Sequence, residues 1–157
     1  MSAMTPEQRL QQLGLVLPTV SAPRGNFDAY VLDGHTLYLS GKGSPLRNDM
    51  AVVPKVGREI STDEARQHAR DVGLHLIATM QAALGDLSRV RRVVKLLGMV
   101  NATPEFPDHP KVINGCSELF AQVWGEENGI GARSAVGMGG LPGGIAVEIE
   151  GIFELTS

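Results

Sequence analysis

Apolar residues recur every three or four positions between Thr62 and Leu84, and this spacing predicts a long helix. Ser61 followed by Glu64 has the pattern of an N-terminal capping box, and Gly85 suits the C-terminal end. Such a stripe buries one side of a helix against a core. Its members are Ala65, Ala69, Val72, Leu76, Met80 and Leu84.

A second helix is predicted from about Pro110 to Trp124, with Asp108 or His109 as its cap. Its apolar stripe contains Cys116, so we expect a buried and inert thiol rather than a nucleophile. Trp124 at the helix end is expected to pack in the core or lie at an interface rather than bind a ligand. A shorter helix is predicted over Thr5 to Leu13.

Strand patterns surround these helices. Residues 27–32 and 36–40 have strand composition, and Asp33-Gly34 between them is a hairpin turn signal. Residues 132–138 and 145–155 are predicted to be the closing strands. The order of strands, helix, strand, helix and strands predicts an α+β fold, with two helices packed on one face of a mixed sheet.

The segment from Val90 to Val100 is predicted to be a strand with two apolar faces. Alternation places Val94, Leu96, Gly98 and Val100 on one face, and Val93, Lys95, Leu97 and Met99 on the other. Such a strand must be covered on both sides. A helix layer covers one face, and another subunit is the simplest cover for the second.

Composition sets the protein class. The chain has 157 residues, enough for one domain over residues 1–157, and a formal net charge of −3, which disfavours a nucleic-acid partner. A single cysteine fits a reducing cytoplasm. We see no signal-peptide pattern and no apolar run long enough to span a membrane, so the sequence predicts a cytoplasmic protein without membrane attachment.

Generic catalytic motifs are absent from the sequence, including the phosphate-binding glycine loop and the nucleophile elbow of hydrolases. His68 and His75 lie seven residues apart, wider than helical metal ligands usually do, and no Cys or carboxylate cluster completes a site. We therefore expect neither a metal nor a cofactor.

Two features near the C-terminus could carry chemistry. Glu148 and Glu150 share one face of the last strand, where they form either a solvated surface or part of a functional cavity. Arg133 lies among small residues that leave room around its guanidinium, a planar group matched to carboxylates. The pattern leaves two alternatives for Arg133: binding a ligand carboxylate, or a structural salt bridge with Glu148 or Glu150.

The order and spacing of several short motifs resemble the RidA/YjgF family, also called the endoribonuclease L-PSP family. These motifs are Ala22–Phe27, Leu39-Ser40-Gly41, Ile113-Asn114-Gly115, Arg133-Ser134, Leu141-Pro142 and Val147–Glu150. The resemblance spans residues 18–155 and leaves residues 1–17 as an N-terminal extension. An extended stretch between Ser44 and Ser61, and a longer loop after Trp124, indicate the longer branch of the family.

The resemblance implies a chorismate-mutase-like fold and a homotrimer with a barrel-like core and clefts between subunits. It implies hydrolysis of reactive 2-imino acids to 2-keto acids and ammonia. Arg133 would bind the substrate carboxylate and Glu148 would position or deprotonate a water.

The same resemblance implies supporting roles for other residues. Ser40 and Gly41 would line the cleft, Asn114 would support it by hydrogen bonding, and Phe27 would close it from the adjacent subunit. Two positions depart from the family pattern: Phe27 replaces the usual Tyr, and Ala135 replaces a frequent Cys and would act through its backbone. These departures leave carboxylate binding intact and affect the expected substrate range.

Two other functions are compatible with the sequence. One is a non-catalytic trimer that binds a small carboxylate metabolite in the Arg133 cleft. The other is an endoribonuclease or translation inhibitor, for which the one notable basic cluster is Arg89, Arg91, Arg92 and Lys95. The acidic net charge disfavours this last function.

Overall fold

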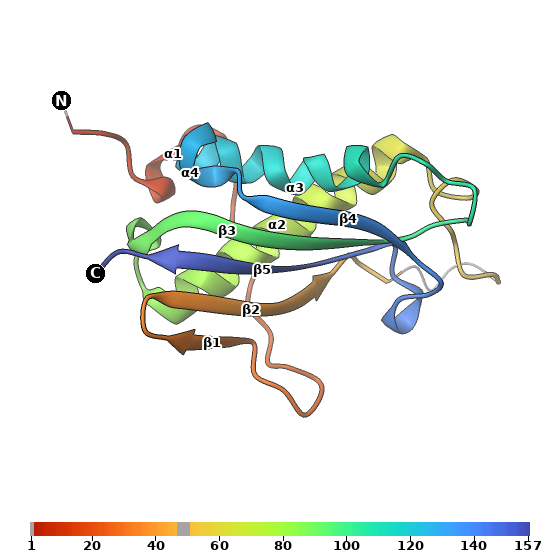
Figure 1. Cartoon of the computed structure of the whole chain (residues 1–157), viewed down its shortest axis with the longest axis horizontal. Helices are drawn as coiled ribbons and strands as arrows, with labels where there is room; N and C mark the ends of the chain where they lie inside the picture. The colour runs from red at the N-terminus through yellow and green to blue at the C-terminus, as the bar shows by residue number, and fades with distance from the viewer. Residues whose placement is uncertain (1, 47–50) are drawn as a thin grey trace.

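The computed structural model describes residues 2–46 and 51–157. They form a five-stranded mixed sheet in the order β1-β2-β5-β3-β4 (Figure 1). The pair β3 and β4 is parallel and the other neighbouring pairs are antiparallel. The strands are β1 (Tyr30–Asp33), β2 (Thr36–Gly43), β3 (Val90–Asn101), β4 (Ala132–Met138) and β5 (Val147–Leu155).

Two long helices, α2 (Thr62–Leu84) and α3 (His109–Trp124), pack side by side on one face of this sheet (Figure 1). The predicted α+β fold with two helices on one face is therefore confirmed. Short helices α1 (Pro6–Gln12) and α4 (Glu126–Gly129), and two 3₁₀ turns, η1 (Leu87–Arg89) and η2 (Pro142–Gly144), complete the elements. None of the helices in the described ranges could cross a membrane.

Local sequence explains the helix boundaries. The Ser61 side chain accepts the Glu64 backbone N–H at 3.1 Å, as the capping pattern predicts. Gly85 ends α2 at a φ of +76°, a conformation that glycine adopts without strain. Asp108 occupies the N-cap position of α3, but its side chain makes no capping hydrogen bond.

The hydrophobic core lies between the helices and the sheet. Cys116 on α3 is completely buried in it, and burial raises the pKa of the thiol, so the prediction of a buried, inert cysteine is confirmed. Trp124 packs edge-on against Phe120, and its indole Nε1 donates to the Leu87 carbonyl at 3.4 Å. The predicted packing role of Trp124 is confirmed.

The predicted alternation along β3 is wrong at its beginning. The register with β5 shifts between Val93 and Lys95, which marks a β-bulge. Val93 therefore faces the helices with 1% of its surface exposed, whereas Val94 is 41% exposed. Beyond the bulge the prediction holds, because Leu96 packs toward the helices while Leu97 lies on the face that no helix covers.

The first predicted strand begins later than its composition suggests. Residues 24–27 form bends, and β1 starts only at Tyr30. The Asp28 carbonyl accepts the Ser40 hydroxyl at 2.6 Å, and the Ala29 carbonyl accepts the Ser40 N–H at 3.1 Å. This anchoring leaves Phe27 outside the sheet, with 53% of its surface exposed.

Part of the extended stretch between Ser44 and Ser61 is joined to the core. Residues 47–50 lie outside the described residues. Val56 is fully buried, and its N–H donates to the Asn101 carbonyl at 2.9 Å. Lys55 Nζ donates to Asn101 Oδ1 and, at 2.9 Å, to the Gly139 carbonyl. These bonds hold residues 55 and 56 against the carboxyl end of β3.

Candidate functional site

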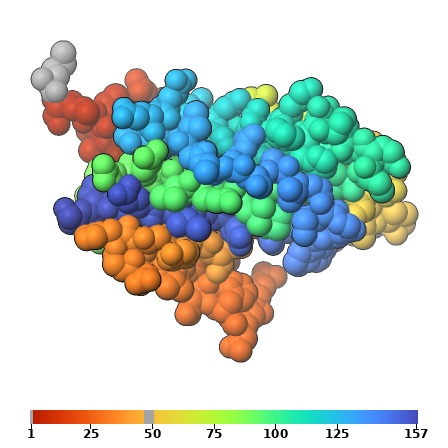
Figure 2. Space-filling model, viewed as in Figure 1, coloured from red at the N-terminus to blue at the C-terminus, as the bar shows by residue number. Residues whose placement is uncertain are grey.

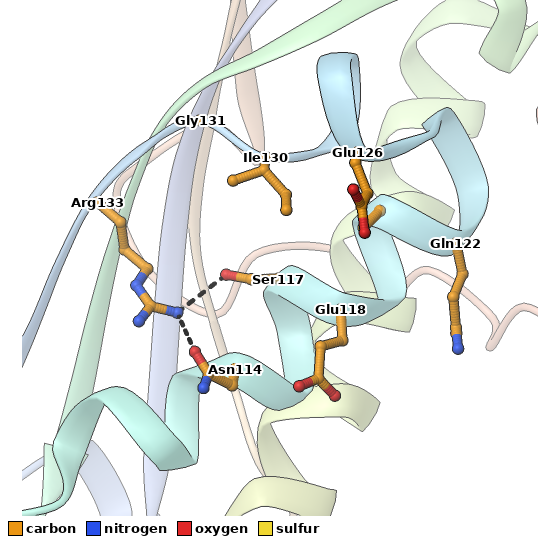
Figure 3. A pocket seen from close by; sticks show the side chains of 9 residues that line it. Asn114, Ser117, Glu118, Gln122, Glu126, Ile130, Gly131 and Arg133 are labelled. Carbon is orange, nitrogen blue, oxygen red and sulfur yellow. Dashed lines mark hydrogen bonds between the residues drawn. The ribbon is translucent and has the colours of Figure 1, made fainter.

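Arg133 lies on the edge strand β4, paired with Leu96 of β3, and points to the helix-covered side of the sheet. Its Nη1 donates to Asn114 Oδ1 at 2.9 Å and to Ser117 Oγ at 3.1 Å, both on α3 (Figure 3). Both acceptors are uncharged, so they orient the guanidinium without neutralising it. A half-buried, oriented guanidinium of this kind suits a carboxylate ligand.

The Arg133 guanidinium borders an open groove of about 660 Å³. The α3 residues that form its floor are three or four apart, so they share one side of the helix. The opposite wall is the segment that joins α4 to β4. The lining residues are Asn114, Ser117, Glu118, Ala121, Gln122, Glu126, Ile130, Gly131 and Arg133.

Glu148 lies on the opposite face of the sheet from Arg133. Its neighbours Val147 and Ile149 are fully buried under the helices, so Glu148 points to the uncovered face. Glu148 pairs with Met99 of β3, and Met99 pairs with Val136 of β4. Strand β3 therefore lies between Glu148 and β4, and the two strand spacings add up to about 10 Å. A salt bridge between Arg133 and Glu148 or Glu150 of the same chain is therefore wrong.

The Glu148 carboxyl is partly desolvated. A Cβ added to Gly41 would stand 3.0 Å from Glu148 Oε2, so the side chain rests on the glycine backbone of β2. Burial, and secondarily the negative charge of Glu150, raise the pKa of Glu148 above its ordinary value. A carboxyl with a raised pKa is better suited to exchange protons near neutral pH.

The structure brings the remaining predicted residues into two groups. The Glu148 group consists of Glu148, Gly41 and Ser40, since the Glu148 side chain rests on Gly41 and Ser40 precedes Gly41 on β2. Phe27 lies in the bend before β1, with its ring near Gly25. The Arg133 group consists of Arg133, Asn114 and Ser117. Each group is on its own side of the sheet, and a single subunit does not unite them.

Two positions refine the Arg133 group. Ala135 shares the face of Arg133, where it is partly buried against the core. Ser117 was missed by sequence reasoning, although it lies one helical turn after Asn114 and therefore on the same side of α3. That spacing was the available signal.

Within residues 2–46 and 51–157, no three His, Cys, Asp or Glu side chains are grouped as metal ligands. Burial and the positive charge of nearby Lys42 lower the pKa of His75. His75 is therefore a neutral side chain beside a cation at neutral pH.

Comparison with known proteins defines the class. Residues 7–137 match the family described as "YjgF/chorismate mutase-like, putative endoribonuclease". This match covers most of the chain, and the fold agrees with it. The chain therefore belongs to the YjgF/RidA family.

Individual relatives cover nearly the whole chain. Protein TCP17 of Trypanosoma cruzi is 43% identical over 150 residues, which span 94% of this chain and 92% of that protein. A protein of unknown function from Agrobacterium tumefaciens is 41% identical, with a TM-score of 0.83 and coverage of 97% and 94%. RidA from Psychrobacter is 26% identical, with a TM-score of 0.57 and coverage of 85% and 92%.

Proposed function

We propose that the protein hydrolyses small 2-imino acids to 2-keto acids and ammonia. The observation that carries this proposal is the Arg133 guanidinium, held by neutral partners at the end of an open groove. A 2-imino acid presents a carboxylate next to an electrophilic carbon, so one fixed guanidinium orients the reacting centre. The chain belongs to the YjgF/RidA family and is similar to a RidA protein, and this is the family whose resemblance implies imine hydrolysis.

The reaction needs few groups. Glu148 accepts a proton from water while the water oxygen forms a bond to the protonated imine carbon, and the C=N electron pair moves to nitrogen. The proton then returns from Glu148 to the amine nitrogen of the tetrahedral intermediate. As the C–N bond breaks, the hydroxyl oxygen forms the C=O bond of the keto acid, and the hydroxyl proton passes to the departing ammonia, which leaves as ammonium. The raised pKa of Glu148 suits this double role, because the carboxyl can both accept and release the proton.

We propose that the working site combines two subunits of a homotrimer. Arg133 and Glu148 point to opposite faces of one sheet, so they can contact the same small substrate only if they come from different copies. The face without helices exposes apolar side chains that a second copy would cover. They include Val31 at 52% and Tyr38 at 43% exposure. Phe27 would approach the substrate from the same subunit as Glu148.

The direct test generates imino acids in situ with an amino-acid oxidase and measures ammonia and keto-acid release. The protein is expected to accelerate hydrolysis of the alanine-derived imine well beyond the spontaneous rate. Thermal stabilisation by the keto acid without any acceleration would instead support a non-catalytic binder. RNA cleavage that persists in Arg133→Ala but is lost in Arg91→Ala/Arg92→Ala would support an endoribonuclease.

The pH dependence gives a prediction specific to Glu148. Because Glu148 must be ionised to accept a proton, kcat/KM should rise as the pH passes through its pKa, which lies above the ordinary glutamate value. Glu150→Gln removes one cause of the raised pKa, so this limb should move to lower pH. Burial, the larger cause, remains, so the limb should stay above that of an ordinary glutamate.

The matched control for that pH profile is Glu154→Gln. Glu154 lies on the same strand face as Glu150 but pairs with Arg91 at 3.0 Å, far along β5 from Glu148. Its replacement should leave the limb in place. An unmoved limb in Glu150→Gln, or an equal movement in both variants, would contradict the assignment of the limb to Glu148.

A further inference from the structure

The groove beside Arg133 is electrically asymmetric along its length. Arg133 lies at one end, and Glu126 lies beyond Ile130 toward the other end (Figure 3). Glu126 opens α4, which follows α3 after Gly125. Gly125 has a φ of +83°, a conformation that favours glycine, and this turn brings Glu126 back over the groove.

The acidic and amide side chains of the groove differ in their availability to a ligand. Glu118 forms an ion pair with Arg66 of α2. The Gln122 side-chain oxygen accepts from Arg70 Nη2 at 3.0 Å. Glu126 is exposed and has no ion pair among the residues that the structure describes. It therefore supplies the uncompensated negative charge of the groove.

The wall between the two ends is apolar. Ile130 is 50% exposed and projects into the groove between Arg133 and Glu126 (Figure 3). From Ser117, which binds Arg133, to Gln122 near the far end, α3 rises about 7.5 Å. An extended chain of a few methylene groups spans such a distance and would pack on Ile130.

We propose that Glu126 selects 2-imino acids whose side chain ends in a cationic group, such as a guanidinium. This inference rests on the proposed imine hydrolysis. The ligand carboxylate binds Arg133, the methylene groups lie on Ile130, and the terminal cation pairs with Glu126. Figure 2 shows the α4 segment in blue beside α3 at the molecular surface.

The test compares the imines of arginine and citrulline, which have the same shape but differ in the charge of the terminal group. Both are generated in situ by an amino-acid oxidase, and kcat/KM is measured for each. We expect the native protein to prefer the arginine-derived imine about fivefold, the effect of a partly exposed ion pair. Glu126→Gln should reduce this ratio to about one.

Glu127→Gln is the matched control, because Glu127 is the next residue of α4, is exposed, and does not line the groove. It should keep the native preference. A native ratio of one, with both imines hydrolysed, would overturn the role of Glu126 and leave the proposed function standing. Equal loss of preference in both variants would also overturn it, because a general charge effect would then be responsible.

A different result would identify failure of the proposed function itself. If neither imine is hydrolysed faster than in buffer, calorimetry with the two corresponding 2-keto acids decides the inference. Tighter binding of the guanidino than the ureido keto acid, lost in Glu126→Gln but not in Glu127→Gln, would support selection by Glu126. Equal binding of the two keto acids to the native protein would overturn it.

Discussion

Arg133→Ala is expected to lower kcat/KM for the alanine-derived imine by about a thousandfold, or about 4 kcal/mol. The substitution removes charge-assisted hydrogen bonds to the carboxylate and the orientation that they impose. Arg133→Lys keeps the charge but loses the planar fork, so it should recover only part of the activity. The kcat/KM of the native protein, Arg133→Ala and Arg133→Lys is measured from steady-state ammonia release.

Folding must be separated from catalysis in this variant. Arg133→Ala leaves Asn114 Oδ1 and Ser117 Oγ without their donor, which should cost about 1 kcal/mol of stability. A variant with native circular dichroism and a small loss of thermal stability is therefore suitable for the assay. Arg91→Ala, which breaks an exposed ion pair with Glu154, is the control and should retain activity. Undiminished hydrolysis by folded Arg133→Ala would refute the proposed function.

Mixing two inactive variants is expected to restore activity. Glu148→Gln should be nearly inactive, because glutamine cannot accept the proton from water. If the site combines Arg133 of one subunit with Glu148 of another, trimers refolded from equal amounts of Arg133→Ala and Glu148→Gln contain some sites with both native residues. Random assembly makes about a quarter of the sites complete.

The expected recovery is therefore about a quarter of the native rate, measured by ammonia release after joint refolding. Variants refolded separately and then mixed without exchange are the control and should remain inactive. Joint refolding without any recovery would show that each site draws Arg133 and Glu148 from one chain. That outcome would contradict the two-subunit site. The assays of the single variants would still test the roles of Arg133 and Glu148.

Much of the fold could be predicted because its signals are local. The stripe that includes Leu76 and the cap at Ser61 specify α2 within the helix itself. The stripe with Cys116 specifies α3 in the same way. By contrast, Val93 rather than Val94 faces the helices because of a bulge in the pairing of β3 with β5. Such a bulge cannot be predicted from the alternation of residues along one strand.

The candidate site shows the same division. Asn114 and Arg133 were predicted as parts of one site through family resemblance, and the structure joins them by a hydrogen bond of 2.9 Å. Ser117 was missed because its one signal, a position one helical turn after Asn114, points to a site only once Asn114 is known to face Arg133. The composition of residues 27–32 predicted that Phe27 begins a strand. Instead, the Ser40 hydroxyl donates to the Asp28 carbonyl, β1 begins only at Tyr30, and Phe27 lies outside the sheet.

The sequence by itself determined the two long helices, the buried thiol, the family and the identity of the charged residues in the site. Periodicity, caps and motif spacing express these properties within short segments. Only the tertiary structure decided that Arg133 and Glu148 face opposite sides of the sheet. The side of the sheet to which a side chain points depends on strand order, direction and register. These properties arise from contacts between segments far apart in the chain.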